Sequence, residues 1–214
     1  MRARSGSKTT QLVERVLSGD GDGVVVANDA DSKRCHTLIK RTSSLGLRAC
    51  ALVVTCHMAQ KMPRLEAERE GGYDRIICDV PCTGDGTTRK HPEVFARWEV
   101  ALALRQHPLQ LQIAMRGAAL LRVGGLMCYS TCSLNPIENE AVVAAMLRTF
   151  GPHTLRLVDV SSELPELHRR PGLSTWRVWY RAQWQASWAE LQALGSRGRV
   201  TSRGRGRGRG PTHP

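Results

Sequence analysis

The chain has 214 residues and carries 31 Lys and Arg against 19 Asp and Glu, a formal charge of +12. Its length can bury a hydrophobic core without disulfide bonds, and no apolar run is long enough to cross a bilayer, so we exclude a membrane-spanning protein. The basic excess disfavours a basic partner and favours a polyanion such as nucleic acid. Seven Cys without regular spacing predict free thiols in a reducing compartment.

Short apolar runs alternate with helical patterns through residues 1–190. A helix is expected at Lys8–Leu17, which ends before Gly19, and another at Leu109–Leu121, after Pro108. Strands are expected at Gly23–Asp29, Cys50–Thr55, Tyr73–Asp79 and Leu126–Ser130. The alternation predicts an α/β fold with a parallel sheet and helices on both faces, whose ligands lie beyond the carboxyl ends of the strands.

A further helix is expected to begin after Asn135. Asn135 can cap it, Pro136 suits the first helical position, and Glu138 can reach back to the cap.

The last part of the chain has a different composition. Residues 191–214 contain six Arg, no Lys and no acid, in a Gly/Arg repeat that predicts disorder. We therefore expect a catalytic domain at 1–190 and a disordered tail at 191–214. The tail can contact RNA phosphates and bases, and the alternatives are a solubilising tail or a nuclear-transport signal.

Two cysteine-containing blocks follow predicted strands. Residues 78–87 and 129–133 each place a polar residue and a Cys at the carboxyl end of a strand. The first block is followed by Arg89 and Lys90, which is typical of a loop that approaches a phosphate backbone. A Cys near cations can act as a nucleophile.

Two other interpretations of these cysteines stay open at this point. Each block contributes a pair separated by three residues, and the two pairs together could form a four-cysteine zinc site. All four could instead be buried core residues. The four are Cys78, Cys82, Cys128 and Cys132.

In combination the motifs are highly specific. Asp79–Lys90 reads Asp-Val-Pro-Cys-Thr-Gly-Asp-Gly-Thr-Thr-Arg-Lys, and Tyr129–Glu140 contains Ser-Thr-Cys-Ser-Leu-Asn-Pro-Ile-Glu-Asn-Glu. Together with Gly6–Leu12 and Ala27–Cys35, they resemble the Nop/Sun (NSUN) family of RNA (cytosine-5) methyltransferases, most closely the eukaryotic tRNA-modifying subgroup. The resemblance implies a Rossmann-like, S-adenosylmethionine-dependent methyltransferase sheet and RNA as partner, with tRNA as the expected substrate. It implies no metal.

The chemistry of that family explains the need for two cysteines. Carbon 5 of cytosine is a weak nucleophile, and a thiolate that adds to carbon 6 makes carbon 5 able to take a methyl group. By resemblance, Cys132 is this nucleophile, Cys82 assists release, and Asp79 contacts the base or lies between base and cofactor. The base must be unpaired or flipped out of its stack.

Cofactor binding is expected at the start of the chain. Asp29 ends a predicted strand, where an acid bonds ribose hydroxyls in nucleotide-binding α/β folds, although a turn or cap role is the alternative. The Gly6 loop leads into a helix N-terminus, which suits a carboxylate or phosphate. The predicted cofactor residues are Gly6, Ser7, Lys8, Asp29 and Asp79, and the predicted RNA-binding residues are Lys8, Arg89 and Lys90.

The sequence departs from the family pattern in three places, of which one is the expected absence of the family's upstream RNA-binding region, closing strand and downstream RNA-binding domain. The resemblance implies a central strand before Gly6, and Met1–Ser5 is too short and too charged to supply it. We therefore expect a sheet without its first strand, in a truncated or degenerate member. Met58 stands where the family has an acid that contacts adenine. The alternative function is a catalytically impaired paralogue or fragment that binds RNA, and the expected location is the nucleus, including the nucleolus, with the cytoplasm as the alternative.

Four tryptophans lie near the end of the predicted domain. They could form a stacking surface for bases or could pack among themselves and the core. They are Trp176, Trp179, Trp184 and Trp188.

Overall fold

The computed structural model describes residues 6–19, 23–43, 51–64, 72–180 and 183–186. The chain divides into two compact units, Met1–Leu167 and His168–Pro214. The predicted boundary at residue 190 and the Gly/Arg tail lie outside the described residues. None of the described helices combines the length and the apolar character that a membrane span requires.

The first unit begins with helix α1, Ser7–Ser18, as the apolar face of this segment predicts. Val13 on that face is fully buried, and Gly19 ends the helix. Helix α2, Ser32–Thr42, follows strand β1 and begins at Asp31, whose side chain accepts hydrogen bonds from the backbone N–H groups of Lys33 and Arg34. This satisfied N-terminus explains why a helix forms in a segment for which no helix was predicted.

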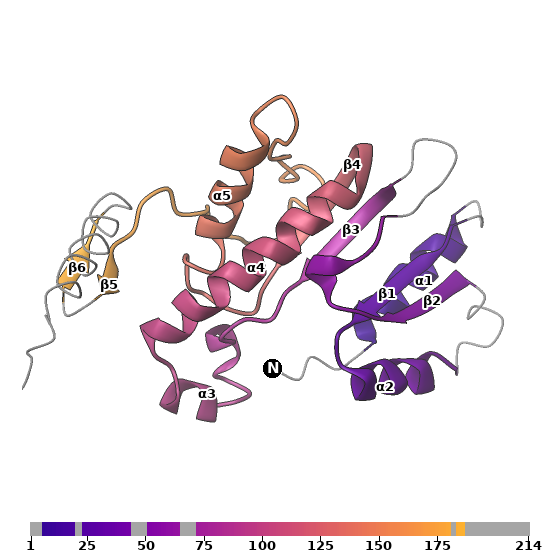
Figure 1. The fold of residues 1–214 in the computed structure, drawn as a ribbon, viewed down its shortest axis with the longest axis horizontal. Helices are drawn as coiled ribbons and strands as arrows, with labels where there is room; N and C mark the ends of the chain where they lie inside the picture. The colour runs from indigo at the N-terminus through magenta and orange to yellow at the C-terminus, as the bar shows by residue number, and fades with distance from the viewer. Residues whose placement is uncertain (1–5, 20–22, 44–50, 65–71, 181–182, 187–214) are drawn as a thin grey trace, which may run out of the picture. The chain divides into compact units, whose positions relative to one another are not determined.

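Four parallel strands confirm the predicted strand positions, but they form two separate pairs (Figure 1). Strand β1, Val25–Asp29, pairs with β2, Leu52–Cys56. Strand β3, Tyr73–Asp79, pairs with β4, Leu121–Ser130. Among the described residues no strand joins β1 to β3.

Two helices cover the β3–β4 pair. Figure 1 shows α4, Val100–Leu120, lying along β3 with α5, Glu140–Phe150, beside it. Ala114 of α4 forms a buried core with Val142 and Met146 of α5. The short helices η2 (Ala59–Lys61), η3 (Asp85–Thr87) and α3 (Glu93–Ala96) lie in the loops.

Three predicted boundaries are wrong. Helix α4 does not begin after Pro108 but runs through it from Val100, so tertiary packing outweighs the local penalty of a proline. Strand β4 begins at Leu121 because an irregularity in the β3–β4 pairing, with Gly124 at φ 75°, extends the strand before Leu126. The helix expected from Asn135 begins only at Glu140.

The second unit contains the antiparallel pair β5, Val178–Tyr180, and β6, Gln183–Gln185. Trp179 and Trp184 pack edge to face with ring centroids 5.2 Å apart, and the Arg177 guanidinium lies 5.1 Å from the Trp184 centroid. Trp179 and Trp184 therefore pack on each other, but both remain partly exposed, so a stacking surface stays a prediction. Trp188 lies outside the described residues.

Candidate active site

The carboxyl ends of β3 and β4 bring predicted site residues together. Asp79 ends β3 beside Ser130 at the end of β4, and the Ser130 hydroxyl donates to Asp79 Oδ1 at 3.2 Å. Lys8 Nζ, in the first turn of α1, lies 2.6 Å from Asp79 Oδ2. Asp79 thus links three elements that are far apart in the sequence.

The two predicted catalytic cysteines lie next to each other. Cys82 Sγ and Cys132 Sγ are 3.0 Å apart, and the Cys132 backbone N–H donates to Cys82 Sγ at 3.3 Å. The Gly86 N–H also donates to the Cys132 carbonyl at 2.9 Å. Because a disulfide bond is roughly 2.05 Å long, both cysteines are free thiols, and both are half-buried.

The environment of Cys82 favours its neutral form. Burial raises the pKa of this thiol, and the negative charge of Glu138 raises it further, while hydrogen bonds from the Cys132 and Gly84 backbones act in the opposite direction. The folded protein therefore favours the protonated thiol at this position.

The geometry excludes the four-cysteine zinc site. Cys78 is buried against Gly117 of α4, while Cys128 is paired in register with Ile77 and therefore points to the opposite face of the β3–β4 pair. Burial raises the pKa of Cys78 to about 11, as expected of an inert core thiol. In the described part of the chain no group of three or more His, Cys, Asp or Glu could hold a metal ion.

The predicted cofactor residues lie at the N-terminus of α1 and at the carboxyl end of β1. Gly6 has φ 110°, and a Cβ there would lie 3.1 Å from Leu38 Cδ1, so a glycine suits this position. In the part of the chain that the structure describes, no side chain caps the N-terminus of α1, so its first N–H groups suit an anion. Asp29 accepts from the Asp31 N–H at 3.0 Å and pairs with Arg34 Nη2 at 2.9 Å.

These features test whether the predicted cofactor fits. S-adenosylmethionine carries a carboxylate and two ribose hydroxyls. Uncapped helix N–H groups suit the carboxylate, and the Asp29 carboxylate at the end of a parallel strand suits the hydroxyls. The residues present therefore fit the cofactor. Met58, where the family has an acid, is 53% exposed after β2 and offers only an apolar surface.

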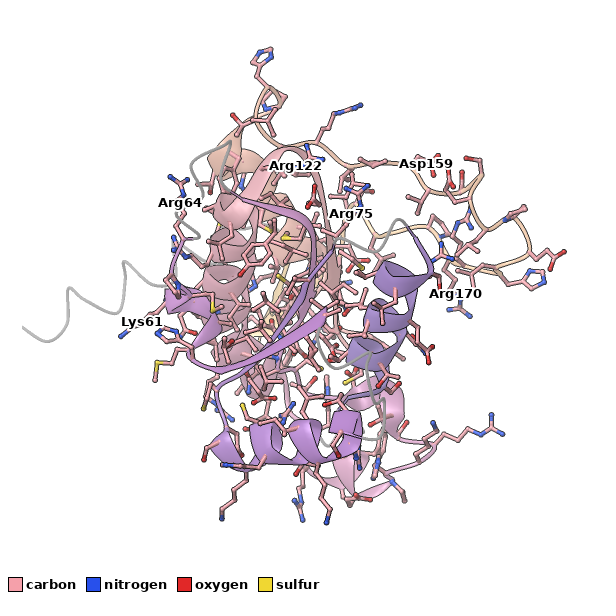
Figure 2. All side chains as sticks on the ribbon, turned by 90° about the vertical axis from the view of Figure 1, so that its right-hand side faces the viewer. Lys61, Arg64, Arg75, Arg122, Asp159 and Arg170 are labelled. Atoms are coloured by element: carbon pink, nitrogen blue, oxygen red, sulfur yellow. The ribbon has the colours of Figure 1, made fainter. Side chains whose placement is uncertain are left out.

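The predicted RNA-binding cations of the Cys82 loop lie at the surface. Arg89 and Lys90 are exposed, and neither forms an ion pair with another described residue. Figure 2 shows two further exposed cations, Lys61 and Arg64, extending away from the ribbon after β2. This second pair was not predicted from the sequence, because two isolated cations in a loop carry no distinctive pattern.

Comparison with known proteins identifies the family. The family model for 16S rRNA methyltransferase RsmB/F matches residues 1–173. The chain belongs to the RsmB/F methyltransferase family. The match contains every predicted site residue, and it confirms the resemblance to RNA methyltransferases that the cysteine blocks indicate.

Relatives of this chain carry names that agree with the resemblance. It is 46% identical over 191 residues to the multisite-specific tRNA:(cytosine-C(5))-methyltransferase of Saccharomyces cerevisiae, covering 85% of this chain and 27% of the relative. It is 40% identical over 189 residues to the tRNA (cytosine(34)-C(5))-methyltransferase of Drosophila melanogaster, and this match covers 83% of this chain and 25% of the relative. The chain thus spans about a quarter of the length of these relatives.

A solved structure supports the fold. The crystal structure of NSun6 from Pyrococcus horikoshii with SFG matches with a TM-score of 0.57 and 26% identity, covering 70% of this chain and 36% of that one. The predicted α/β methyltransferase fold is therefore confirmed.

One group of residues at the site was not predicted from the sequence. Glu138 was expected to cap a helix, but its side chain is fully buried and bonds the Cys82 and Cys132 loops instead. The Asn135 side chain caps the turn by accepting from the Ile137 N–H, and the Asn135 N–H bonds Ser133 Oγ, so the predicted reach of Glu138 to Asn135 is wrong. An acid within a specific motif was the available signal, yet the same spacing also matches a capping box.

Proposed function

We propose that this chain carries a site that methylates carbon 5 of cytosine in RNA, with tRNA as the substrate and S-adenosylmethionine as the cofactor. One observation carries the proposal: two free thiols lie 3.0 Å apart, Cys82 on the loop after β3 and Cys132 on the loop after β4. Asp79, at the end of β3, forms an ion pair with Lys8. Family membership and the names of the relatives support it.

The cofactor would be held by Gly6, Ser7 and Lys8 at the N-terminus of α1 and by Asp29 at the end of β1. When bound, it supplies the methyl group. Gly6 and the uncapped N–H groups bind its carboxylate, and Asp29 orients its ribose.

Cys132 acts as the nucleophile. Its thiolate forms a bond to carbon 6 of cytosine, and the electron pair of the C5–C6 double bond moves onto carbon 5. Carbon 5 would then bond the cofactor's methyl group, and the electron pair of the broken S–CH3 bond would leave with the cofactor sulfur. The carbon 5 proton then leaves to water, and the electrons of that C–H bond restore the double bond. The sulfur–carbon 6 bond breaks, and its electron pair returns to the Cys132 thiolate. Cys82, 3.0 Å from Cys132, is placed to assist this release.

Asp79 and Lys8 would act on the base. Their ion pair places a carboxylate and an ammonium group together at the end of β3. Such fixed charges can hold the polar edge of a flipped cytosine and stabilise the charge that develops on its ring.

The test uses the whole chain, methyl-labelled S-adenosylmethionine and tRNA. We expect label on carbon 5 of cytosine, its loss in Cys132→Ala, and a covalent protein–RNA adduct on denaturing gels in Cys82→Ala. Cys128→Ala removes an exposed thiol outside the site and serves as the control. RNA binding without methyl transfer would favour the alternative of an RNA-binding protein without activity.

Location in the nucleus rests on the resemblance and the basic tail, and it stays a prediction. A fluorescent fusion of the whole chain, compared with one that ends at residue 190, tests it. A cytoplasmic signal from the whole chain would contradict it.

A further inference from the structure

Glu138 is a fully buried carboxylate that accepts four hydrogen bonds. Its Oε1 accepts from the Thr83 hydroxyl at 2.5 Å and the Ser133 hydroxyl at 2.9 Å. Its Oε2 accepts from the Thr83 backbone N–H at 3.0 Å and from Gln110 Nε2 at 2.8 Å. The hydrogen-bonding capacity of the carboxylate is therefore filled by neutral donors.

The charge of Glu138 has no cationic partner among the described residues. A buried carboxylate is rarely found without one, because its desolvation is costly. Four hydrogen bonds offset that cost here. Because only neutral donors bind the Glu138 carboxylate, we attribute this residue to a role in the site rather than to an ion pair.

The donors come from both cysteine loops. Thr83 follows Cys82 directly, and Ser133 follows Cys132 directly, so one carboxylate holds the residue next to each thiol. Gln110 Nε2, from α4, also donates to the Pro81 carbonyl on the other side of Cys82, at 2.9 Å. The Cys82 backbone is thus held from both sides.

Gln110 itself is poorly explained by stability. Its side chain is fully buried, and its Oε1 has no hydrogen-bond partner among the described residues. An unpaired buried oxygen costs free energy, which an apolar side chain of similar size would avoid. The amide group is therefore best explained by the two bonds that its Nε2 makes to Glu138 and Pro81.

We infer that Glu138 is a positioning residue that, with Gln110, fixes the Cys82 and Cys132 loops against each other so that the two thiols stay within reach of one cytosine ring. The inference rests on the proposed function for its role in catalysis. Its geometric content, the fixed distance between the two sulfurs, can be measured without methyl transfer.

The measurement is the equilibrium constant for disulfide formation between Cys82 and Cys132. Oxidised glutathione takes two electrons and two protons from Cys82 and Cys132, which yields one protein disulfide and two molecules of glutathione. The equilibrium constant gives the effective concentration of one thiol at the other, and it falls when the loops are no longer held together. Mass spectrometry of the linked peptide separates this pair from the other cysteines.

Three variants of Glu138 and a control give distinct expectations. Glu138→Ala removes the carboxylate that bonds both cysteine loops, and Glu138→Asp shortens the side chain that carries it. Both should lower the effective concentration of one thiol at the other about tenfold or more. Glu138→Gln should stay within about threefold of the wild type, because its oxygen can accept from the two N–H groups while its amide group donates to the two hydroxyls. Glu163→Gln, at an exposed position, should change nothing.

Methyl transfer provides the second measurement. Glu138→Ala should lower kcat and leave KM for S-adenosylmethionine within about twofold, because the cofactor residues are on other elements. Glu138→Gln should rescue most of kcat. If the wild-type chain transfers no methyl group, the proposed function fails, and the thiol measurement still decides the positioning role.

An effective concentration in folded Glu138→Ala equal to that of the wild type would overturn the inference. So would a Glu138→Gln protein as impaired as Glu138→Ala. If Glu138→Ala does not fold, Thr83→Val and Ser133→Ala each remove one donor from one loop and should lower the effective concentration about threefold. No change in either would also overturn it.

Discussion

Burial gives the cysteines of one small region different chemical properties. Cys78 is only 7% exposed between β3 and α4, whereas Cys82 and Cys132 are half-buried and touch each other. The pKa of Cys78 is raised to about 11, mainly by burial and also by the nearby Cys128. Reactivity therefore belongs to the loops beyond the strands and not to the strands themselves.

This difference predicts alkaline destabilisation. The folded protein holds Cys78 as a neutral thiol up to a pKa of about 11, while the unfolded chain ionises near its usual 9.0. The stabilisation is complete below pH 9 and falls by about 3 kcal/mol as the pH rises to 11. Urea unfolding at pH 8, 9 and 10 should show this slope in the wild type and a shallower one in Cys78→Ala. The exposed Gln112→Ala is the control, and a slope unchanged in Cys78→Ala would contradict the assignment.

The cations of the Cys82 loop predict a salt effect. Replacing both Arg89 and Lys90 with Ala removes two exposed charges that could each neutralise a phosphate. For single-stranded RNA we expect the slope of log K against log salt to become shallower by about 1.4. Fluorescence anisotropy between about 50 and about 200 mM salt measures it. Arg156→Ala with Arg148→Ala is the control pair, and an unchanged slope in the loop variant would remove these residues from the RNA surface.

The site residues differ in how far the sequence could predict them. Asp79, Cys82 and Cys132 follow strands in recognisable blocks, and their meeting follows from the common edge of parallel strands. The role of Glu138 could not be predicted in this way. Its local spacing matches a helix cap, while its partners Gln110 and Thr83 are 28 and 55 residues away in the chain.

At the scale of elements, α4 packs closely on the β3–β4 pair through a glycine. A Cβ on Gly117 would lie 2.7 Å from Cys78 Sγ and 3.0 Å from Met127 Sδ. The helix therefore approaches the strands more closely than an alanine would allow. Its course through Pro108 has a related cause, since the buried face that includes Ala103, Ala114 and Gly117 continues on both sides of the proline.

The close approach predicts the outcome of Gly117→Ala. Helix propensity alone would favour Ala by about 1 kcal/mol, but the contact with two sulfur atoms should make the variant less stable by about 1–3 kcal/mol. Cys78→Ala combined with Gly117→Ala should recover part of this loss, because one of the two clashing atoms is gone. Urea unfolding measures both, with the exposed Gln112→Ala as control. Additive losses in the double variant would contradict the contact.

At the scale of the whole molecule, the sequence pattern predicts some elements better than others. The sequence pattern predicts the four parallel strands correctly because each is a short apolar run with polar ends. It does not predict α2, whose N-terminus depends on the Asp31 side chain, or the extension of β4 past Gly124, which depends on pairing with β3. Contacts made across the fold decide these cases, and a local pattern does not contain them.

The tail gives a prediction at the same scale. Ending the chain at residue 190 removes six Arg and no acid, which lowers the formal charge from +12 to +6. RNA affinity at low salt should fall, and the salt slope should become shallower by as much as about 4. Methyl transfer at saturating RNA should persist. A six-fold Arg→Lys tail keeps the charge and is the control. Equal RNA affinity with and without the tail would favour the solubilising or transport interpretation.

The contact between Cys82 and Cys132 has a consequence for folding kinetics. The two thiols are 50 residues apart in the sequence, and they meet only after β3 and β4 have paired and α4 has closed the connection between them. Bringing such distant segments together carries a large loop-closure entropy, and parallel pairings of this kind form slowly. We therefore expect the thiol pair to form late in folding, and a partly folded chain to hold the two cysteines apart.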